Sequence, residues 1–487
     1  MRERLLRLRA LLLPPSDTAN TDVPATSSFI LTVTGQLLQG LARVAYAILV
    51  TRWWGLEAQS HVAWALSAAT FLVLLGPQPV GVMATKYLSA SRGHQDPERF
   101  EAVARFSSLM AVGTAGFLAA VGVGWSYWVG QPAVLAPSLF VLIFALGGYN
   151  YVRGVRTGSN HFRTTAAWDA LSSLVALALL VVVVACGWFT LVLLPLALGY
   201  LAYGLAGWPR PGLRGSVAEL RWDMLGFSAW TAVQLVAATG LLQLTVLVGR
   251  AFVTPTAHGA YTAAVALATP ISMLSGSLMM AMSPTVARRH AAGDDAGVRA
   301  GVDGMLRALV AGLFPFFALA ILWAEPLLQL VYGHTTPASG LMFTLLLLGV
   351  SATSYNAANA RLLGGDAGGV KVLASANVAG LLVGVLSMFL LGPRHGMVGC
   401  AVAFVLGAGV SGLAPLMIVW RMDRMRWGGI VARLGLAYGA VMAAAFALAE
   451  SADHLVRLTA TVGLLFVWVV VARRDLARIA EALRVAR

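Results

Sequence analysis

Charged residues, lysine and cysteine are all scarce in this chain. Only 11% of its 487 residues are charged, whereas 59% are hydrophobic and the mean hydropathy is +0.79. This balance excludes a soluble domain, because so few charges cannot keep so much apolar surface in water. The two lysines, Lys86 and Lys371, lie in ATKY and GVKV, outside any Gly-Lys-Ser/Thr sequence of a phosphate-binding loop. ATP hydrolysis by the chain itself is therefore excluded.

Residues that bind metals or act as catalysts are equally sparse. Cys186 and Cys400 lie in apolar segments without ligand spacing, and each is predicted to be a small buried hydrophobic residue. The eight histidines are scattered, and no Ser-His-Asp arrangement can be defended. We therefore predict that the chain binds no metal and no cofactor, and that it is not an enzyme.

What the sequence has instead is a long series of apolar stretches from Ser28 to Ala472. Each has about 20 residues or more, enough to cross about 30 Å of hydrocarbon as a helix, and a lipid-exposed segment must satisfy its own backbone hydrogen bonds. The sequence therefore predicts an all-α polytopic membrane protein of about fourteen transmembrane helices. Their approximate ranges are 28–50, 62–88, 103–128, 133–152, 166–187, 189–207, 224–249, 259–285, 302–324, 337–360, 368–391, 397–420, 429–449 and 454–472.

Positive charge is concentrated on one side of these predicted helices. Lys and Arg number 34 against 20 Asp and Glu, a formal net charge of +14. If the amino terminus is cytosolic, the opposite side holds only Arg52, Arg250, Arg394 and Arg457. This is the positive-inside pattern of a membrane protein rather than a nucleic-acid surface. It predicts a multi-pass protein of the bacterial inner (plasma) membrane with both termini in the cytosol and no nucleic-acid partner.

The two ends of the chain are basic. MRERLLRLRALLLPP has too short an apolar run for a secretory signal and no small-residue cleavage site, so residues 1–26 are predicted to be an uncleaved cytosolic arm. The carboxyl-terminal residues 473–487 are basic and amphipathic. They are compatible with an interfacial helix or with a solvated tail.

An internal repeat relates two parts of the chain. Tyr149-Asn150 followed by Gly158 recurs as Tyr355-Asn356 followed by Gly364, and RWWGLEAQSHVAWALSAAT resembles RAFVTPTAHGAYTAAVALAT. Because each half has an even number of helices, the halves are related by an axis along the membrane normal. The predicted parts are an N-terminal six-helix half at 27–208, a C-terminal half at 222–421 and a terminal helix pair at 428–472.

The first predicted helix carries a polar stripe. Thr32, Gln36, Gln39 and Arg43 are spaced by four, three and four residues, so they share one helix face. We predict that this face lines a water-filled lumen, because an isolated arginine facing lipid is unfavourable. The alternative is that Arg43 snorkels or pairs with a carbonyl or carboxylate between helices.

Weaker polar stripes occur later in the chain. Thr239, Gln243 and Arg250 share a face of the seventh predicted helix, and Asn356 and Asn359 lie near the cytosolic end of the tenth. Arg250 is either a second lumen cation or an interface anchor. The asparagines either line the lumen or form hydrogen bonds between helices.

Acidic residues and prolines bear on the mechanism. All 20 carboxylates, Asp169 among them, fall in connectors or near predicted helix ends, which predicts no proton- or sodium-binding carboxylate in mid-membrane. Gly76-Pro77-Gln78-Pro79, Pro270 and Pro284 interrupt the second and eighth helices. Proline opens the helical hydrogen-bond ladder, either to bend a helix around a lumen or simply to kink it.

Several stretches resemble one known group of proteins. They are TRWWGLEAQSHVAWALSAA, LLGPQPVGVMATKYLSASRG, GAYTAAVALATPISMLSGSLMMAMSPTVARR and LGPRHGMVGCAVAFVLGAGVSG. In this order the chain resembles the polysaccharide (O-antigen) flippases of the multidrug/oligosaccharidyl-lipid/polysaccharide exporter (MOP) superfamily. The loop Glu57-Ala58-Gln59-Ser60 departs from that family, whose members usually have a glycine-containing phrase there.

The resemblance implies a MATE-like, V-shaped transporter that exports polyprenyl-pyrophosphate-linked oligosaccharide to the outer leaflet by alternating access. It implies a lipid-linked saccharide as substrate, contact with membrane lipid, and a polysaccharide polymerase or glycosyltransferase as partner. A lipid II flippase and a multidrug/cation antiporter share the frame, although the antiporter needs a membrane carboxylate. A non-transporting scaffold of a glycan-synthesis complex also fits the topology but leaves the polar stripe of the first helix unexplained.

Overall fold

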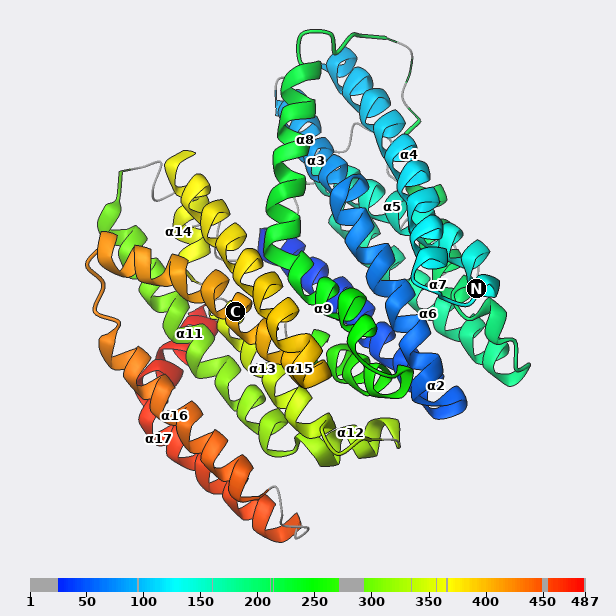
Figure 1. Cartoon of the computed structure of the whole chain (residues 1–487). Coiled ribbons are helices and arrows are strands. Elements are labelled where there is room, and N and C mark those ends of the chain that lie inside the picture. The colour runs from blue at the N-terminus through cyan, green and yellow to red at the C-terminus, as the bar shows by residue number, and fades with distance from the viewer. Residues whose placement is uncertain are drawn as a thin grey trace, which may run out of the picture. The chain divides into compact units, whose positions relative to one another are not determined.

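The computed structural model describes most of the chain, and all of its regular elements in that part are helices (Figure 1). The described residues are 25–93, 96–159, 161–210, 212, 214–270, 293–333, 335–355, 357–364, 367–448 and 454–485. Almost all of the predicted arm at 1–26 therefore lies outside them. The predicted all-α fold is confirmed.

The described helices form two compact units. Unit 1 comprises Met1–Arg250 and Thr254–Thr262, and unit 2 comprises Ala251–Val253 and Ala263–Arg487. The predicted six-helix halves rest on an internal repeat, which this division by packing does not test. We describe each unit by itself.

Unit 1 is organised around α5, which packs against α3, α4 and α7, while α2 packs along α6. Its helices are α2 (Ala25–Leu75), α3 (Pro77–Gly93), α4 (Pro97–Trp128), α5 (Ala136–Gly158), α6 (Phe162–Ala185), α7 (Leu194–Gly207), α8 (Arg221–Leu235) and α9 (Leu241–Gly249). A π-helical turn at Val236–Gly240 joins α8 to α9.

Glycine and proline set the helix ends in α2 and α3. Gly55 has φ of 84° inside α2, a conformation that residues with a side chain rarely adopt, so the helix is broken there. A turn at Gly76 separates α2 from α3, which begins at Pro77, where a missing N–H costs nothing. The predicted second helix at 62–88 is thus bent where its prolines indicated.

The contact between α3 and α5 is a seam of small residues. A Cβ atom on Gly154 would lie 2.3 Å from the carbonyl oxygen of Gly81, and one on Gly158 would lie 2.9 Å from backbone atoms of Thr85. The Thr85 hydroxyl donates to the carbonyl oxygens of Gly81 (3.0 Å) and Gly154 (2.8 Å), and Ser89 donates to that of Gly158 (3.1 Å). Small residues let the two backbones approach this closely.

Unit 2 is centred on α11, against which α13, α16 and α17 pack. Its helices are α11 (Asp295–Leu322), α12 (Ala324–Tyr332), α13 (Ser339–Ser354), α14 (Ala358–Gly364), α15 (Ala367–Met422), α16 (Gly428–Ala447) and α17 (His454–Val485). Gly396, with φ of 59°, breaks α15. The outer faces of α16 and α17 expose large apolar side chains such as Leu436, Phe446 and Phe466.

Eleven helices within the described ranges are long and apolar enough to cross a membrane. Two of them, Leu37–Leu75 and Lys371–Met422, contain the breaks at Gly55 and Gly396 and each covers parts of two predicted helices. The predicted helix at 259–285 continues past residue 270, outside the described residues. The count of fourteen therefore stays a prediction. One cysteine assignment is wrong: Cys400 is buried, but Cys186 is exposed because it lies just beyond the end of α6.

Candidate functional site

Unit 1 contains a buried cluster of arginine, tyrosine and aspartate side chains from α2, α5, α6 and α7. We call it the arginine–tyrosine cluster. Its members are Arg43, Tyr149, Arg153, Arg156, Asp169, Tyr200 and Tyr203.

Local helix geometry aligns the members that share an element. Tyr149, Arg153 and Arg156 follow one another at spacings of four and three on α5, and Tyr200 and Tyr203 are three apart on α7. Residues at these spacings lie on one face of a helix. Because α5 packs against α7, the two faces meet.

Arg43 joins the cluster from α2. Its Nη2 and Nε atoms lie 3.1 and 3.3 Å from the hydroxyl oxygen of Tyr200 and donate to it. The Tyr149 ring contacts both α7 tyrosines, with centroid distances of 5.0 Å to Tyr200 and 4.6 Å to Tyr203. The rings thus link Arg43 to the charged residues of α5.

Asp169 on α6 is the carboxylate of this cluster, and none of its surface is exposed. Its Oδ1 atom accepts a hydrogen bond of 2.9 Å from the Tyr149 hydroxyl. Its Oδ2 atom lies 3.5 Å from Nε of Arg153, an ion pair without a hydrogen bond. The carboxylate is therefore held firmly by a tyrosine and loosely by an arginine.

Arg156 is the most deeply buried of the three arginines, with 5% of its surface exposed, whereas Arg43 and Arg153 are partly exposed. Its guanidinium group lies 4.7 Å from the centroid of the Tyr203 ring and 5.7 Å from that of Trp168, and ring faces attract cations. Neither Nη atom has a hydrogen-bond partner. A buried donor left unpaired costs free energy, so this group is available to an acceptor.

The cluster as a whole carries an excess of positive charge, since it contains three arginines and one carboxylate. Other buried polar atoms around it also lack partners, among them Nε2 of Gln39 and the hydroxyl groups of Tyr46 and Tyr203. Charged groups in a membrane are expensive and normally paired. This combination of unpaired donors and uncompensated charge is suited to binding an anion.

A small cavity adjoins the cluster. It is lined by Gln39, Ala42, Arg43, Ser172, Ser173, Leu196 and Tyr200. Ser172 and Ser173 follow Asp169 by about one turn, and their hydroxyl groups donate to its carbonyl oxygen at 3.2 and 2.7 Å. The cavity therefore opens beside the one carboxylate and the end of the predicted polar stripe.

The structure brings together two of the predicted site residues, Gln39 and Arg43, at this cavity. Thr32 and Gln36 lie in α2, but their side chains are outside the described part of the chain, as is Asn356 entirely. Whether any of these residues contacts a substrate stays a prediction.

The other predicted residues are not members of the cluster. Gln243 is partly buried on α9, and Arg250 follows that helix with an unpaired Nε atom. The π-helical turn that includes Thr239 changes the register on which the predicted common face depended. Thr239 is exposed and donates to the carbonyl oxygen of Leu235. Asn359 on α14 has a buried, unpaired Oδ1 atom.

Sequence analysis missed Arg153, Arg156 and Asp169. The two arginines follow the predicted helix at 133–152 and were treated as connector charges, but α5 continues to Gly158. Asp169 lies near the start of the candidate span Arg163–Ala185, close to a helix end as predicted, but it is fully buried against neighbouring helices, which its place in the sequence did not indicate. The four-and-three spacing from Tyr149 onward was the signal that could have revealed them.

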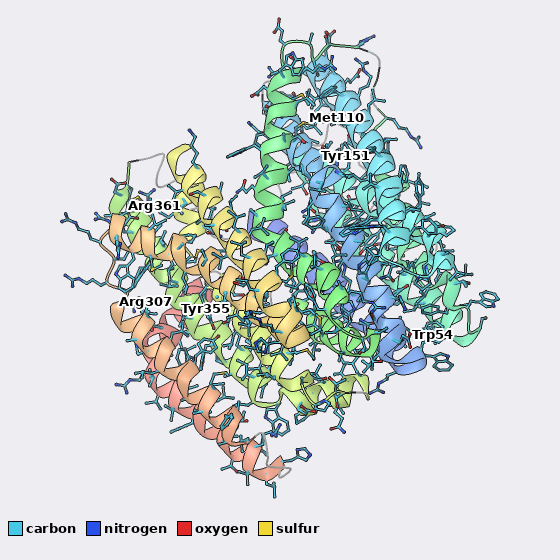
Figure 2. All side chains as sticks on the ribbon, viewed as in Figure 1. Trp54, Met110, Tyr151, Arg307, Tyr355 and Arg361 are labelled. Carbon is cyan, nitrogen blue, oxygen red and sulfur yellow. The ribbon has the colours of Figure 1, made fainter. Side chains whose placement is uncertain are left out.

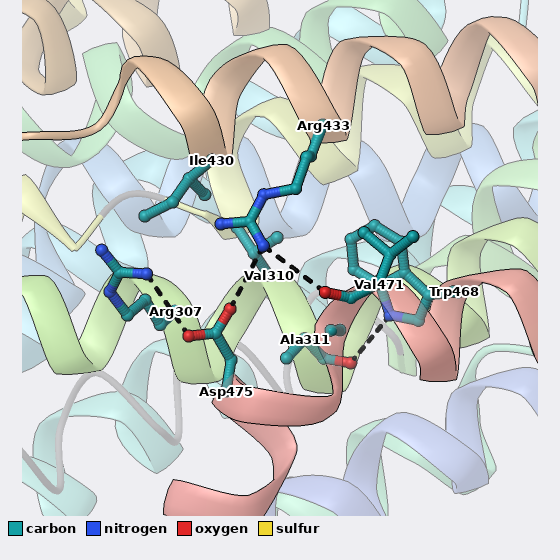
Figure 3. Close-up of a pocket in the computed structure, with 9 residues that line it drawn as sticks. Arg307, Val310, Ala311, Ile430, Arg433, Trp468, Val471 and Asp475 are labelled. Atoms are coloured by element: carbon teal, nitrogen blue, oxygen red, sulfur yellow. Dashed lines mark hydrogen bonds and ion pairs between the residues drawn. The ribbon is translucent and has the colours of Figure 1, made fainter.

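Unit 2 contains a second group of charges, where the terminal helices meet α11 (Figure 3). We call it the terminal-pair cluster: Asp303, Arg307, Trp427, Arg433 and Asp475. Arg307 pairs with Asp303 (2.7 Å) and Asp475 (3.3 Å), Arg433 lies 3.8 Å from Asp475, and the Trp427 indole donates to Asp303 (3.0 Å). Arg361 and Asp423 form a further pair at 3.0 Å, with Arg361 labelled in Figure 2. In these contacts each charge has an opposite partner.

Comparison with known proteins shows similarity to one family and to several transporter structures. Residues 94–336 match the family described as polysaccharide biosynthesis protein, whereas no curated protein matches the chain. The structure is similar to that of the lipid II flippase MurJ in an inward closed conformation, with a TM-score of 0.68 and 12% identity over 92% of this chain and 100% of MurJ.

Two further similar structures are transporters of the MOP superfamily. An inward-facing multidrug resistance MATE family transporter has a TM-score of 0.65 and 14% identity over 83% of this chain and 99% of its own. A transporter from Pyrococcus furiosus, described as having a binding pocket of reverse polarity that suggests a different function, has a TM-score of 0.50 and 13% identity over 82% and 95%.

These identities are low, so the structural matches show a common fold. The predicted MATE-like fold is confirmed, and the chain is a multi-pass membrane protein. The family and the fold are those of transporters and flippases rather than enzymes. Over residues 94–336, about half of its length, the chain is similar to the family of polysaccharide biosynthesis proteins, and its fold is that of transporters of the MOP superfamily.

Proposed function

We propose that this chain is a flippase that moves polyprenyl-pyrophosphate-linked oligosaccharide from the cytosolic to the outer leaflet by alternating access. The observation that carries the proposal is the arginine–tyrosine cluster of unit 1, which contains three arginines and one buried carboxylate, with only Arg153 ion-paired to that carboxylate. The family match to polysaccharide biosynthesis proteins supports the substrate class.

The headgroup of such a lipid requires a cationic and hydrogen-bonding site. A pyrophosphate diester carries negative charge on oxygens that accept hydrogen bonds, and guanidinium groups donate to phosphate in pairs. Arg43 at the cavity and Arg156 with its unpaired Nη atoms supply donors of this kind. The polyprenyl chain would remain in the bilayer while the headgroup occupies the cavity side of unit 1.

The membrane potential can drive this transport without ATP. With the cytosol negative, outward movement of each negative charge gains about 2.3 kcal/mol per 100 mV. We further propose that the protein lies in the bacterial cell membrane with both termini cytosolic and works beside a polysaccharide polymerase or glycosyltransferase.

Two other substrates belong to the same superfamily. Lipid II is also a polyprenyl-pyrophosphate saccharide, and the structural similarity to MurJ makes it the second candidate. Export of cations is disfavoured by the positive excess of the arginine–tyrosine cluster, in which Asp169 is the one carboxylate and already forms an ion pair with Arg153.

The proposal can be tested with purified protein in liposomes. A fluorescent polyprenyl-pyrophosphate saccharide is scored for protection from an external quencher with wild type, Arg43→Ala, Arg421→Ala and empty vesicles. Arg421 is an exposed arginine at the end of α15 and serves as the matched control.

We expect transport by wild type and Arg421→Ala, and at least about a hundredfold loss in Arg43→Ala, roughly 2.7 kcal/mol. Retained transport by Arg43→Ala would show that Arg43 does not contact the headgroup. If no variant moves the lipid but wild type moves a cationic dye, drug extrusion replaces our proposal. Labelled lipid II in parallel vesicles decides between the two saccharide substrates.

A further inference from the structure

We propose that Asp169 is a resident counter-ion that occupies Arg153 in the empty site and is replaced there by a phosphate group of the substrate. Asp169 then reclaims Arg153 when the substrate leaves. This inference deepens the proposed function and rests on it. It assigns Arg153 and Arg156 as headgroup-binding residues and Asp169 as a positioning residue that governs release.

The two oxygen atoms of the Asp169 carboxylate have unequal partners. Oδ1 of Asp169 accepts from Tyr149 at 2.9 Å, whereas Oδ2 has no hydrogen-bond partner and lies 3.5 Å from Nε of Arg153. A charge-assisted hydrogen bond between these groups would be about 2.7 to 2.9 Å. The pair is therefore in contact without being locked, as exchange requires.

Arg156 lies one turn beyond Arg153 on the same face of α5 and also supports the proposal. Only 5% of the surface of Arg156 is exposed, and neither of its Nη atoms has a hydrogen-bond acceptor. A Cβ atom on Gly207 would lie 2.4 Å from Nη2, so α7 approaches this guanidinium group closely because the residue there is glycine. Asp169 forms its ion pair with Arg153, and neither Nη atom of Arg156 has a hydrogen bond to the carboxylate.

The described groups around Asp169 are cations and hydroxyl groups, and none of them is a second anion that could compete for Arg153. On α5 it faces Tyr149, Arg153 and Arg156, and on α2 it packs against Gly35, where an added Cβ atom would lie 2.8 Å from Oδ2. Tyr203 is the nearby ionisable group of α7. An incoming phosphate therefore meets cations and neutral hydroxyl groups, and one carboxylate already bound to Arg153.

If Asp169 exchanges with a substrate phosphate at Arg153, a neutral residue at position 169 should change anion binding differently than if Asp169 were purely structural. Replacing Asp169 by asparagine removes the competing charge but keeps an oxygen that accepts from Tyr149. The anion should then bind more tightly and leave more slowly. A structural role predicts the opposite for binding, because a damaged site loses affinity and transport together.

The test uses the full chain in detergent, titrated with farnesyl pyrophosphate and inorganic pyrophosphate, and the same variants in the liposome assay. For Asp169→Asn we expect about tenfold tighter binding, equivalent to about 1.4 kcal/mol, with transport slowed by a similar factor. Asp169→Glu restores the charge and should return both values toward wild type. Asp423→Asn, which breaks an arginine–aspartate pair of unit 2, should change neither.

A double variant isolates the pair. In Asp169→Asn/Arg153→Gln the gain in affinity should disappear, because the arginine that binds the phosphate is gone. If Asp169→Asn binds the probes equally or more weakly while Asp423→Asn matches wild type, the counter-ion proposal is wrong. If Asp169→Asn does not fold, Arg153→Gln decides alone: weaker binding supports the proposal and unchanged binding overturns it. Failure of wild type to bind either probe would instead reject the proposed function.

Discussion

The two charged clusters of this protein differ in how their charges are compensated. In the terminal-pair cluster, Arg307 and Arg433 share Asp475, and Arg307 also pairs with Asp303. The arginine–tyrosine cluster contains three arginines and one carboxylate, and its one ion pair, from Arg153 to Asp169, has an N–O distance of 3.5 Å. The first arrangement attaches the terminal helices to α11, whereas the second leaves positive charge for something that is not part of the chain.

The comparison teaches that the number of buried charges does not identify a binding site. Arg307, Arg433 and Asp475 of the terminal-pair cluster also line a small pocket, together with Trp468 (Figure 3). Arg307 donates to Asp475, Arg433 lies 3.8 Å from it, and the Trp427 indole donates to Asp303, so each charge has a partner within the chain. Buried ion pairs of this kind hold a geometry rather than bind a ligand. Uncompensated donors are the better guide to function.

The largest expected effect comes from neutralising an arginine of each cluster. Arg156→Met removes a buried, unpaired charge, so we expect the free energy of unfolding to rise by about 1 kcal/mol or more while lipid transport falls at least about tenfold. Chemical unfolding of the purified protein and the liposome assay measure the two quantities. A stability loss together with unchanged transport would make Arg156 a structural residue.

Arg307→Met should have the opposite pattern. It leaves Asp475 and Asp303 without their main partner, and we expect a loss of about 2 kcal/mol of stability, less than for a fully buried pair because these side chains are 11% to 30% exposed. Transport per folded molecule should stay within about twofold of wild type. If transport falls with stability unaltered, the terminal-pair cluster is more than an attachment.

The smallest expected effects come from removing one hydroxyl group in each unit. Tyr200→Phe takes away the partner of Arg43, and Tyr438→Phe breaks its 2.8 Å hydrogen bond to Tyr355, which is labelled in Figure 2. Each should lower stability by about 1 kcal/mol or less. Only Tyr200→Phe should slow transport, by about fivefold; equal transport rates in both variants would contradict this.

Much of the fold was predictable because its signals are local. Apolar length identified the helices, and prolines marked the bend near Gly76. Charge counting could not show that α5 continues through Arg153 and Arg156. In sequence, an arginine in a cytosolic connector cannot be distinguished from an arginine in the last turns of a helix.

The candidate site was predictable only where one helix carried the whole pattern. Gln39 and Arg43 were found because their spacing is helical. The bond from Arg43 to Tyr200 joins residues 157 positions apart, and no local pattern announces such a contact. Asp169 was correctly placed near a helix end, but the packing of α6 against α2 and α5 that removes all of its exposed surface could not be predicted from a local pattern.

The seam between α3 and α5 bears on how the site can move. With Gly154 against Gly81 and one hydroxyl group joining both carbonyl oxygens, these helices have no room to slide or rotate past each other. We therefore expect α3 and α5 to move as one body, with the distance between Arg153 and Arg156 on α5 unchanged. Any opening of the site is then expected to involve movement of α2, α6 or α7 relative to α3 and α5, which would shift Asp169 and Tyr200 relative to Arg153 and Arg156.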